Sequence, residues 1–318
     1  MANIIAVIWD FDKTLIRGNM QDPIFRHYGV DARAFWDEVN AMPERIWASQ
    51  RVRVNPDTVY LNRFLRETGA DGLFPGLNNA MLRAFGKEQE WYPGVPALFR
   101  RLATLHEEHP EWEEHGIRVE NYIVSTGFAE SVRGSELAPY TREIWGCELI
   151  ESEDEPRVIR EIGYTIDNTT KTRAIFEINK GIRELNRDGE PVNVNTKIDE
   201  SLRRVRQENM IYIADGPSDV PAFSVVRAGG GHTMAVYPKG DFAALRQVNG
   251  LLTDERVDVI AEADYREDAT ATMWLLATIE DRARAMTDEI RRRIRAGFGS
   301  SPRHLRETES EDNDAGKR

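Results

Sequence analysis

The fold is decided by the stretch Ile4-Ile5-Ala6-Val7-Ile8-Trp9-Asp10-Phe11-Asp12-Lys13-Thr14 near the N-terminus. Its apolar residues are rich in β-branched side chains and do not alternate with polar ones. Such a run is typical of a parallel strand that is buried on both faces. Two carboxylates, Asp10 and Asp12, follow directly where the run ends. The stretch therefore predicts a buried strand that delivers two acidic side chains to one end of a sheet.

Further apolar runs of the same kind occur along the chain, at residues 122–124, 210–214 and 233–237. Longer amphipathic stretches, such as 95–106 and 171–185, lie between them. Strands that alternate with helices predict an α/β fold built on a parallel sheet. In such sheets a ligand lies outside the carboxyl ends of the strands. Asp10, Ser125 and Asp215 each fall at that end of an apolar run, so we group them.

Residues 18–91 differ from the rest of the chain. They carry aromatic and aliphatic side chains at helical spacing and contain no convincing strand. Pro43, Pro56 and Pro75 divide this region, and Tyr92-Pro93-Gly94 marks the return to the core. We expect a helical cap inserted into the core, although the same helices can also belong to the layers of the core itself. The expected division is a core of 1–17 and 92–265, a cap of 18–91, a C-terminal helix of 266–298 and a disordered tail of 299–318.

Composition excludes several classes of protein. The chain has 318 residues, 41% of them hydrophobic, and a net charge of −12. Nucleic-acid binding needs a basic face, so we expect no nucleic-acid partner. The only cysteine, Cys147, cannot form an intramolecular disulfide. No apolar run reaches the length of a signal sequence or a membrane span, so we expect a cytoplasmic protein with no membrane partner.

The paired carboxylates Asp10 and Asp12 suit a reaction in which one side chain attacks and the other transfers protons. Taken alone, the pair is equally consistent with two solvated loop aspartates. Ser125-Thr126-Gly127 adds a hydroxyl and backbone N–H groups, which suit a phosphate oxygen at a strand end. Lys171, just before an amphipathic stretch, adds a positive charge.

The segment Asp215-Gly216-Pro217-Ser218-Asp219 follows the run at 210–214. Gly216 and Pro217 favour a tight turn, which lets both carboxylates face the end of the sheet. Oxygen ligands are those that Mg²⁺ prefers, and it usually takes few from the protein. Asp10 and Asp215 are therefore candidate Mg²⁺ ligands.

The chain resembles the haloacid dehalogenase superfamily in residues 4–240. The resemblance lies in the order and spacing of four groups, namely Asp10-Phe11-Asp12-Lys13-Thr14, Ser125, Lys171 and Asp215-Gly216-Pro217-Ser218-Asp219. A helical insertion between the first two groups resembles the cap found at that point in one branch of the superfamily. That branch contains the phosphoserine phosphatase-like enzymes. The resemblance implies a Rossmann-like core under a small helical cap. It also implies a Mg²⁺-dependent phosphomonoester hydrolase that acts on a small phosphorylated metabolite.

The same resemblance assigns roles to individual residues. Asp10 attacks phosphorus and becomes an aspartyl phosphate, and Asp12 protonates the leaving oxygen and then activates water. The resemblance also implies that Thr14 supports the loop. It places four residues around the phosphoryl group, namely Ser125, Thr126, Gly127 and Lys171. Mg²⁺ is held by Asp10, the backbone carbonyl of Asp12, and Asp215. Asp219 orients Lys171 or completes the outer shell of the metal.

Several features stand outside this pattern. Lys13 occupies a position where many relatives have glycine, and the motifs do not explain 106–120, 186–209 or the C-terminal extension. The extension leaves room for a homo-oligomer through its helix. We interpret the cluster His106, His109 and His115 as part of a polar loop, with a metal site as the alternative. The arginines that offer a second anion contact are Arg17, Arg45, Arg51 and Arg53.

Other functions use similar residues. A phosphomutase has the same paired aspartates and returns the phosphoryl group to substrate. A non-catalytic phosphate-binding regulatory protein keeps the site without turnover, and a dehalogenase leaves Asp12 without a role. The sequence does not identify the substrate.

Overall fold

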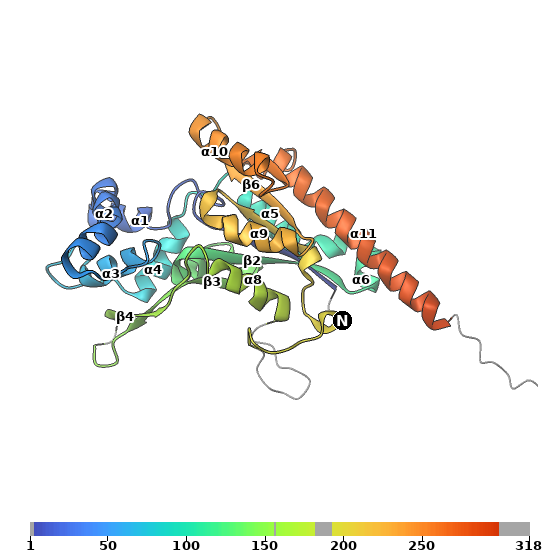
Figure 1. The fold of residues 1–318 in the computed structure, drawn as a ribbon, viewed down its shortest axis with the longest axis horizontal. Coiled ribbons are helices and arrows are strands. Elements are labelled where there is room, and N and C mark those ends of the chain that lie inside the picture. The colour runs from blue at the N-terminus through green and yellow to red at the C-terminus, as the bar shows by residue number, and fades with distance from the viewer. Residues whose placement is uncertain (1–2, 156, 182–192, 299–318) are drawn as a thin grey trace, which may run out of the picture.

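The computed structural model of the protein describes residues 3–155, 157–181 and 193–298. Within these residues, seven strands form one sheet in the order β4-β3-β2-β1-β5-β6-β7 (Figure 1). All neighbouring pairs run parallel except β3 with β4. The strands are β1 (Asn3–Trp9), β2 (Ile117–Phe128), β3 (Thr141–Glu151), β4 (Ile159–Tyr164), β5 (Met210–Ala214), β6 (His232–Tyr237) and β7 (Val259–Glu262). The predicted α/β fold with a Rossmann-like, mostly parallel sheet is confirmed.

The central strand β1 is buried on both faces, which explains its uninterrupted apolar sequence. Ile5, Val7 and Trp9 pack into one hydrophobic core, and Ile4, Ala6 and Ile8 pack into a second core on the other face. Successive side chains of a strand point to opposite faces, so a run without polar residues is required when both faces are covered. This is the physical origin of the pattern at residues 4–9.

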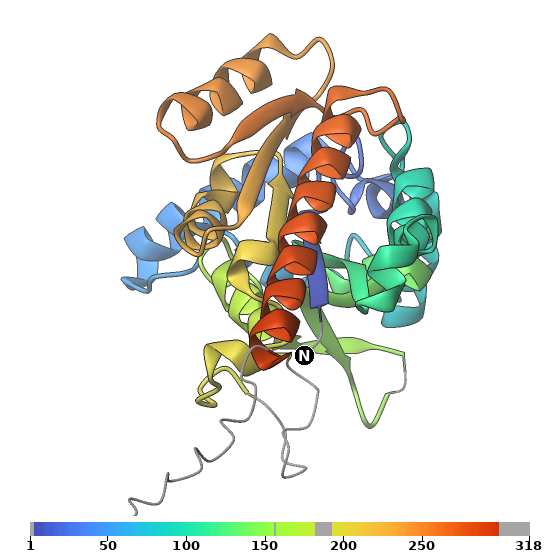
Figure 2. The same cartoon turned by 90° about the vertical axis from the view of Figure 1, so that its right-hand side faces the viewer.

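Helices cover both faces of the sheet. One face packs against α5 (Val95–Thr104) and α11 (Thr270–Phe298), and Figure 2 shows α11 running across it. The other face packs against α8 (Lys171–Lys180), α9 (Val220–Ala228) and α10 (Phe242–Thr253). This arrangement leaves the carboxyl edge of the sheet as the place where side chains from several strands converge.

The segment between β1 and β2 begins with a group of helices that lie together at one side of the molecule (Figure 1). They are α1 (Asp22–Tyr28), α2 (Ala32–Gln50), α3 (Val59–Arg66) and α4 (Asn79–Phe85), followed along the chain by α5 and α6 (Pro110–Glu114). We call α1–α4 with their connections, residues 18–91, the insertion. Its division from the core as a separate cap stays a prediction.

The expectation that Pro43 divides the insertion is wrong, because α2 runs through it. Proline removes one backbone hydrogen bond from a helix interior. The buried side chains Phe35, Val39 and Met42 offset this loss, and Asp31 caps the first turn by accepting hydrogen bonds from two backbone N–H groups. Tertiary packing therefore outweighs the local preference of proline.

Some elements were not anticipated from the sequence. The strands β3, β4 and β7 extend the sheet at both edges, and α7 (Ala129–Gly134) follows β2. Residues 106–120 are not a loop, since they contain α6 and the start of β2. The ring of His109 stacks on Trp112 with their centroids 4.1 Å apart.

The C-terminal helix α11 begins at Thr270 and ends at Phe298. Leu275, Ile279 and Met286 are buried, whereas Ile294 is 49% exposed, so the packed stripe ends before the helix does. The predicted tail of 299–318 and part of the stretch 186–209 lie outside the described residues. No helix among the described residues has the length and apolarity required to cross a membrane.

Candidate active site

Three strands end side by side at the carboxyl edge of the sheet. β1 lies between β2 and β5, and Trp9 is in register with Ile123 of β2 and Ile213 of β5. The backbone N–H of Asp10 donates a hydrogen bond to Ile213 O at 2.9 Å, which fixes where the chain leaves the sheet. The structure thus places Ser125 and Asp215 on either side of Asp10.

Lys171 connects Asp10 to Asp219. It is the first residue of α8, and its ammonium group donates to Asp10 Oδ1 and to Asp219 Oδ1, each at 2.7 Å. The side chain is fully enclosed. Burial by itself lowers the pKa of Lys171, but the two carboxylates outweigh burial and hold the pKa above its usual value. Lys171 therefore remains charged at neutral pH.

Asp219 is fully engaged by its neighbours. Besides Lys171, its Oδ1 accepts a hydrogen bond from the Tyr212 hydroxyl at 2.6 Å, and its Oδ2 accepts one from Ser218 Oγ at 2.9 Å. The carboxylate has no exposed surface. With three donors on its two oxygens and no exposed surface, Asp219 is better suited to orient Lys171 than to bind a metal directly.

Asp10 is held from both sides. Its Oδ2 accepts a hydrogen bond from Thr14 Oγ1 at 3.1 Å, while the carbonyl of Thr14 accepts one from the Tyr265 hydroxyl at 2.7 Å. Burial raises the pKa of Asp10 to about 6, although Lys171 opposes the increase. The nearby charge of Asp219 adds to it. The result is a carboxylate fixed in position and surrounded by more negative charge than one lysine balances.

Asp12 is less enclosed and has a different environment. Its Oδ1 accepts a hydrogen bond from the backbone N–H of Met20 at 2.8 Å. Burial raises the pKa of Asp12 to about 8, and the charge of Asp10 raises it further. A carboxyl group with this pKa can hold a proton near neutral pH, which a general acid requires.

The loop at the end of β2 is tightly packed. Ser125 Oγ accepts a hydrogen bond from the backbone N–H of Gly127 at 3.0 Å. A Cβ atom at position 127 would lie 2.3 Å from Met20 Sδ, so a larger residue there would displace the Met20 side chain. The same sulfur accepts a hydrogen bond from Phe128 N at 2.9 Å. Met20 therefore joins the Ser125 loop to the loop that holds Asp12.

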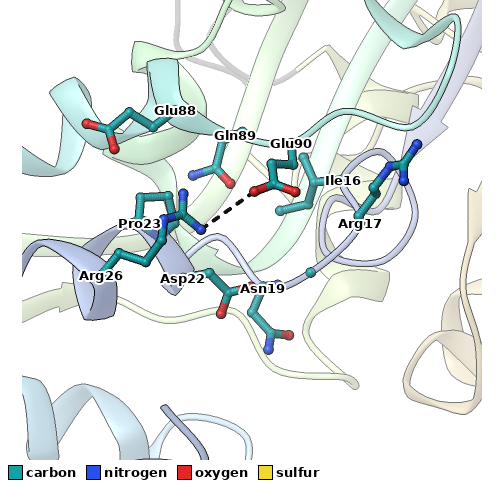
Figure 3. A pocket seen from close by; sticks show the side chains of 10 residues that line it. Ile16, Arg17, Asn19, Asp22, Pro23, Arg26, Glu88, Gln89 and Glu90 are labelled. Atoms are coloured by element: carbon teal, nitrogen blue, oxygen red, sulfur yellow. Dashed lines mark hydrogen bonds and ion pairs between the residues drawn. The ribbon is translucent and has the colours of Figure 1, made fainter. Parts of the chain in front are cut away.

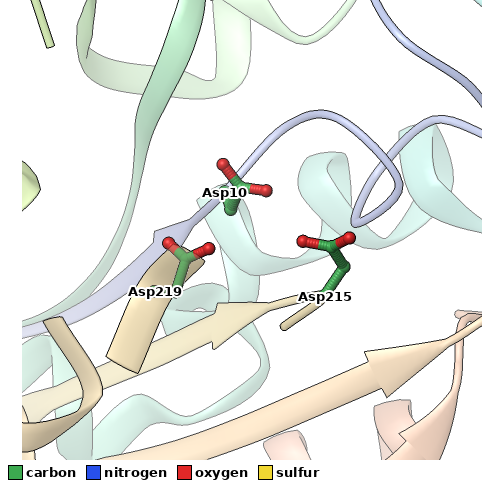
Figure 4. Close-up of side chains that lie close together, drawn as sticks. All are labelled: Asp10, Asp215 and Asp219. Carbon is green, nitrogen blue, oxygen red and sulfur yellow. The ribbon is translucent and has the colours of Figure 1, made fainter. Parts of the chain in front are cut away.

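The donor set fits a divalent cation. Asp10, Asp215 and Asp219 each offer an oxygen, and these oxygens lie within 4.8 Å of one another (Figure 4). Burial raises the pKa of Asp215 to about 7, and the charges of Asp10 and Asp219 raise it further. A bound cation relieves such repulsion, and Mg²⁺ prefers carboxylate oxygens. Because Asp219 is fully buried and already accepts from three donors, Asp10 and Asp215 are the residues that would hold it.

Among the described residues, the histidines His106, His109 and His115 form no group of this kind. Of the arginines considered from the sequence, Arg45 lies 3.8 Å from Glu38, and Arg51 and Arg53 lie over the Trp47 ring at 5.7 and 6.0 Å. Of these four arginines, only Arg17 lines the cavity formed by residues 16–26 and 88–90.

Lys13 adopts a backbone conformation that favours glycine. Its φ is 57°, in the left-handed region that L-amino acids seldom adopt. The loop needs this conformation to bring Asp12 and Thr14 to the site, and Lys13 N donates to Gly18 O at 3.2 Å. The chain therefore accepts local strain where glycine has none.

No protein-family model matches the sequence. An uncharacterized protein of Borreliella burgdorferi is 34% identical over 293 residues, which cover 87% of this chain and 97% of that protein. The chain belongs to the family of that protein. The sheet order and the placement of the four motifs at its carboxyl edge are consistent with the fold of the haloacid dehalogenase superfamily.

Solved structures with a similar fold include members of that superfamily. A HAD family hydrolase of Salmonella enterica serovar Typhi is 16% identical, with a TM-score of 0.49 over 81% of this chain and 67% of the other. A substrate-bound phosphoserine phosphatase is 15% identical, with a TM-score of 0.47 over 84% of this chain and 97% of the other. These likenesses concern the fold alone.

Sequence reasoning missed several residues that hold the site together. Tyr212 had a signal, because a hydroxyl inside a fully buried strand requires a partner. Tyr265 had none, since 251 residues separate it from Thr14. Met20 and Tyr60, which both lie in the insertion, have no feature in the sequence that distinguishes them from core positions.

Proposed function

We propose that this protein is a Mg²⁺-dependent phosphomonoester hydrolase that works through an aspartyl-phosphate intermediate. The observation that carries the proposal is the buried contact between Asp10 and Lys171 at 2.7 Å, beside a second carboxylate, Asp215, that has no hydrogen-bond donor among the described residues. This arrangement offers a nucleophile, a positive charge for phosphate oxygens, and a position for a cation.

The reaction would proceed in two displacements. In the first, an oxygen of Asp10 forms a bond to phosphorus, the bond from phosphorus to the leaving oxygen breaks, and Asp12 gives that oxygen its proton. In the second, Asp12 takes a proton from water, the water oxygen forms a bond to phosphorus, and the bond to Asp10 breaks. Inorganic phosphate and the original carboxylate are released, with Asp12 again protonated.

Lys171 would reduce the repulsion between Asp10 and the phosphate dianion, and Asp219 would keep Lys171 in place. Ser125, Thr126 and Gly127 would donate hydrogen bonds to the phosphoryl oxygens, with Thr14 supporting Asp10 from behind. Mg²⁺, when bound by Asp10, Asp215 and the backbone carbonyl of Asp12, supplies charge neutralisation for the transferred group.

The leaving group would occupy the cavity that Arg17 lines (Figure 3). This cavity has a volume of about 230 Å³, which suits a small metabolite. Arg26 lies 3.8 Å from Glu90 across it, and Arg17 lies on another side. Its lining therefore mixes both charges, which favours a polar leaving group over an apolar one. The lining residues include Arg17, Asn19, Asp22, Arg26, Gln89 and Glu90.

The proposal is tested by incubating the purified full-length protein with Mg²⁺ and an aryl phosphate, followed by a panel of phosphorylated metabolites. Release of inorganic phosphate by the wild type, and none by Asp10→Asn, is the expected result. Release by neither protein across the panel contradicts the proposal. A phosphomutase would move the phosphoryl group to a second position without releasing phosphate, and a regulatory protein would bind without turnover. The cytoplasmic location and the oligomer through α11 stay predictions.

A further inference from the structure

The connection between α2 and α3 contacts both loops that carry the proposed phosphate-binding residues. We call residues 55–60 the bridging segment. The Tyr60 hydroxyl donates to Thr126 O at 2.7 Å, and Asn55 Nδ2 donates to Asp167 Oδ2 at 2.7 Å. The carboxylate of Asp57 also accepts a hydrogen bond, from the backbone N–H of residue 168 at 3.2 Å. These contacts span 66, 112 and 111 residues of sequence, so they join separate parts of the fold.

The bridging segment is itself well fixed. Asn55 Oδ1 accepts a hydrogen bond from Asp57 N at 2.9 Å, and Asn55 O accepts one from Val59 N at 3.0 Å. An Asx turn of this kind leads directly into α3, whose second residue is Tyr60. The ring of Tyr60 is buried against Phe128 and Trp36, with centroids 5.8 and 5.7 Å away. The three side chains that cross to the core therefore come from one short segment, the turn at Asn55 and the start of α3.

Tyr60 acts on a peptide group of the phosphate-binding loop. The carbonyl of Thr126 and the N–H of Gly127 belong to the same planar trans peptide, so they point in opposite directions. A donor that fixes the carbonyl therefore fixes the direction of the N–H. That N–H currently donates to Ser125 Oγ at 3.0 Å. Cys147 Sγ also donates to Thr126 O, at 3.2 Å, but a thiol is the weaker donor.

Asn55 acts on the helix that begins with Lys171. The Oδ1 atom of Asp167 accepts hydrogen bonds from the backbone N–H groups of Thr169 and Thr170 at 2.9 and 2.6 Å. The carbonyl of Asp167 accepts one from Lys171 N at 3.0 Å. Asp167 thus sets the first turn of α8 and the direction in which Lys171 leaves it. Asn55 holds the remaining oxygen of this carboxylate.

We propose that Tyr60 and Asn55 are positioning residues, which set the Gly127 N–H and the Lys171 ammonium at the spacing that one phosphoryl group requires. This rests on the proposed function, since it concerns the same site. The insertion then contributes to the affinity for the phosphoryl group as well as enclosing the leaving group. Tyr60 contributes more than Asn55, because its hydrogen bond is partly buried, whereas that of Asn55 is exposed to water.

A purely structural role predicts a different result from a positioning role. If these hydrogen bonds only hold the insertion to the core, their removal lowers stability and leaves oxyanion affinity unchanged in the folded protein. If they position donors, the affinity for a phosphoryl mimic falls even at temperatures where every variant is folded.

The chain offers matched controls inside the insertion. The Tyr28 hydroxyl donates to Pro75 O at 3.3 Å, and Asn78 Oδ1 caps α4 by accepting from Met81 N at 3.0 Å. Both contacts stay within the insertion. Tyr28→Phe and Asn78→Ala therefore remove the same chemical groups as Tyr60→Phe and Asn55→Ala without touching either phosphate-binding loop.

The experiment measures the dissociation constant of orthovanadate, with Mg²⁺ present, for the full-length wild type and the four variants. Circular dichroism checks that each is folded, and kcat and KM for an aryl phosphate are measured in parallel. We expect Tyr60→Phe to raise the dissociation constant about 10-fold and Asn55→Ala about 3-fold, the range for losing a single hydrogen bond. We expect Tyr28→Phe and Asn78→Ala to stay within about 2-fold of the wild type.

The inference is overturned if Tyr60→Phe binds orthovanadate as tightly as the wild type, or if Tyr28→Phe weakens binding equally. A wild type that binds no orthovanadate contradicts this inference and the phosphate site together. A wild type that binds orthovanadate but hydrolyses no phosphate monoester contradicts the proposed function alone, because the affinities of the variants still decide the positioning role.

Discussion

Two ionic clusters lie on the same sheet and differ in their balance of charge. Near the start of β2, Glu120 accepts hydrogen bonds from both terminal nitrogens of Arg204 at 2.6 and 2.8 Å and another from Tyr122. Burial alone raises the pKa of Glu120, but the hydrogen bonds from Arg204 and Tyr122 outweigh it and hold the pKa below its usual value. At the carboxyl edge, Lys171 is surrounded by several carboxylates whose pKa values are raised, those of Asp10, Asp12 and Asp215.

The balance of charge distinguishes a cluster that stabilises the fold from a cluster that can bind a ligand or take part in a reaction. In the Glu120 cluster the carboxylate and the Arg204 guanidinium pair through two hydrogen bonds. The cluster therefore contributes to stability and requires no ligand. In the Asp10 cluster negative charge exceeds positive charge inside the protein, which costs free energy unless a cation or a proton compensates. Proteins tolerate such an imbalance mainly where it is used.

The largest effect is expected from Asp12→Asn, which keeps the shape of the side chain but removes the exchangeable proton. We expect kcat for an aryl phosphate to fall by about 10²–10⁴-fold, the usual contribution of a general acid and base. Orthovanadate affinity should change little, because Asp12 does not hold the phosphoryl group in this account. Steady-state kinetics and orthovanadate binding give both numbers. Unchanged kcat would remove Asp12 from the mechanism.

The next largest effect comes from a matched pair of substitutions, one in each cluster. Asp219→Asn should lower kcat by about 100-fold, because Lys171 loses one of its two charged partners and its fixed position. Glu120→Gln should leave kcat within about 2-fold and lower the free energy of unfolding by about 1–3 kcal/mol, as expected when one partner of a half-buried pair is lost. Urea denaturation and steady-state kinetics on both variants provide the comparison. Equal losses of kcat would show that the two clusters do not differ in kind.

Mg²⁺ should stabilise the folded protein by binding at the Asp10 cluster, where negative charge is in excess, and not at the Glu120 cluster. At a concentration ten times its dissociation constant, it should raise the free energy of unfolding by about 1.4 kcal/mol, since it binds the folded state alone. The increase should persist in Glu120→Gln and disappear in Asp215→Asn. Thermal denaturation with and without Mg²⁺ measures it. A stabilisation that survives in Asp215→Asn would place the cation elsewhere.

The smallest effect is expected at Lys13, whose left-handed backbone conformation strains the loop that follows Asp10. Lys13→Gly should raise the free energy of unfolding by about 1 kcal/mol, because glycine adopts the left-handed conformation without strain. Its exposed side chain contacts neither cluster by a hydrogen bond that the structure describes. Thermal denaturation is again the measurement, and a loss of stability would show that the lysine side chain contributes more than its backbone costs.

The sequence was informative where a single strand and its end determine the outcome. The run at 4–9 predicts burial on both faces, and the positions after three such runs predict which side chains converge. It was uninformative where contacts form between distant segments. Tyr265 with Thr14, Tyr60 with Thr126, and Asn55 with Asp167 each depend on the packed fold.

Local patterns also failed where packing outweighed them. Pro43 predicted a break, yet α2 continues because its apolar stripe is buried. The strands β3 and β4 were not predicted because polar residues interrupt their apolar runs, and β7 was not predicted because it has only four residues. The helices of the insertion were visible by their spacing, but not the hydrogen bonds that connect them to the site.

In the proposed mechanism, Asp10 becomes covalently phosphorylated during turnover. The most direct test is to quench the full-length protein in acid during steady-state hydrolysis of a phosphate monoester with Mg²⁺, digest it, and locate any added phosphoryl group by mass spectrometry. We expect one phosphoryl group on Asp10, which is lost on treatment with hydroxylamine and absent from Asp10→Asn. Rapid turnover with no modified peptide, or a phosphoryl group on another side chain, would contradict it.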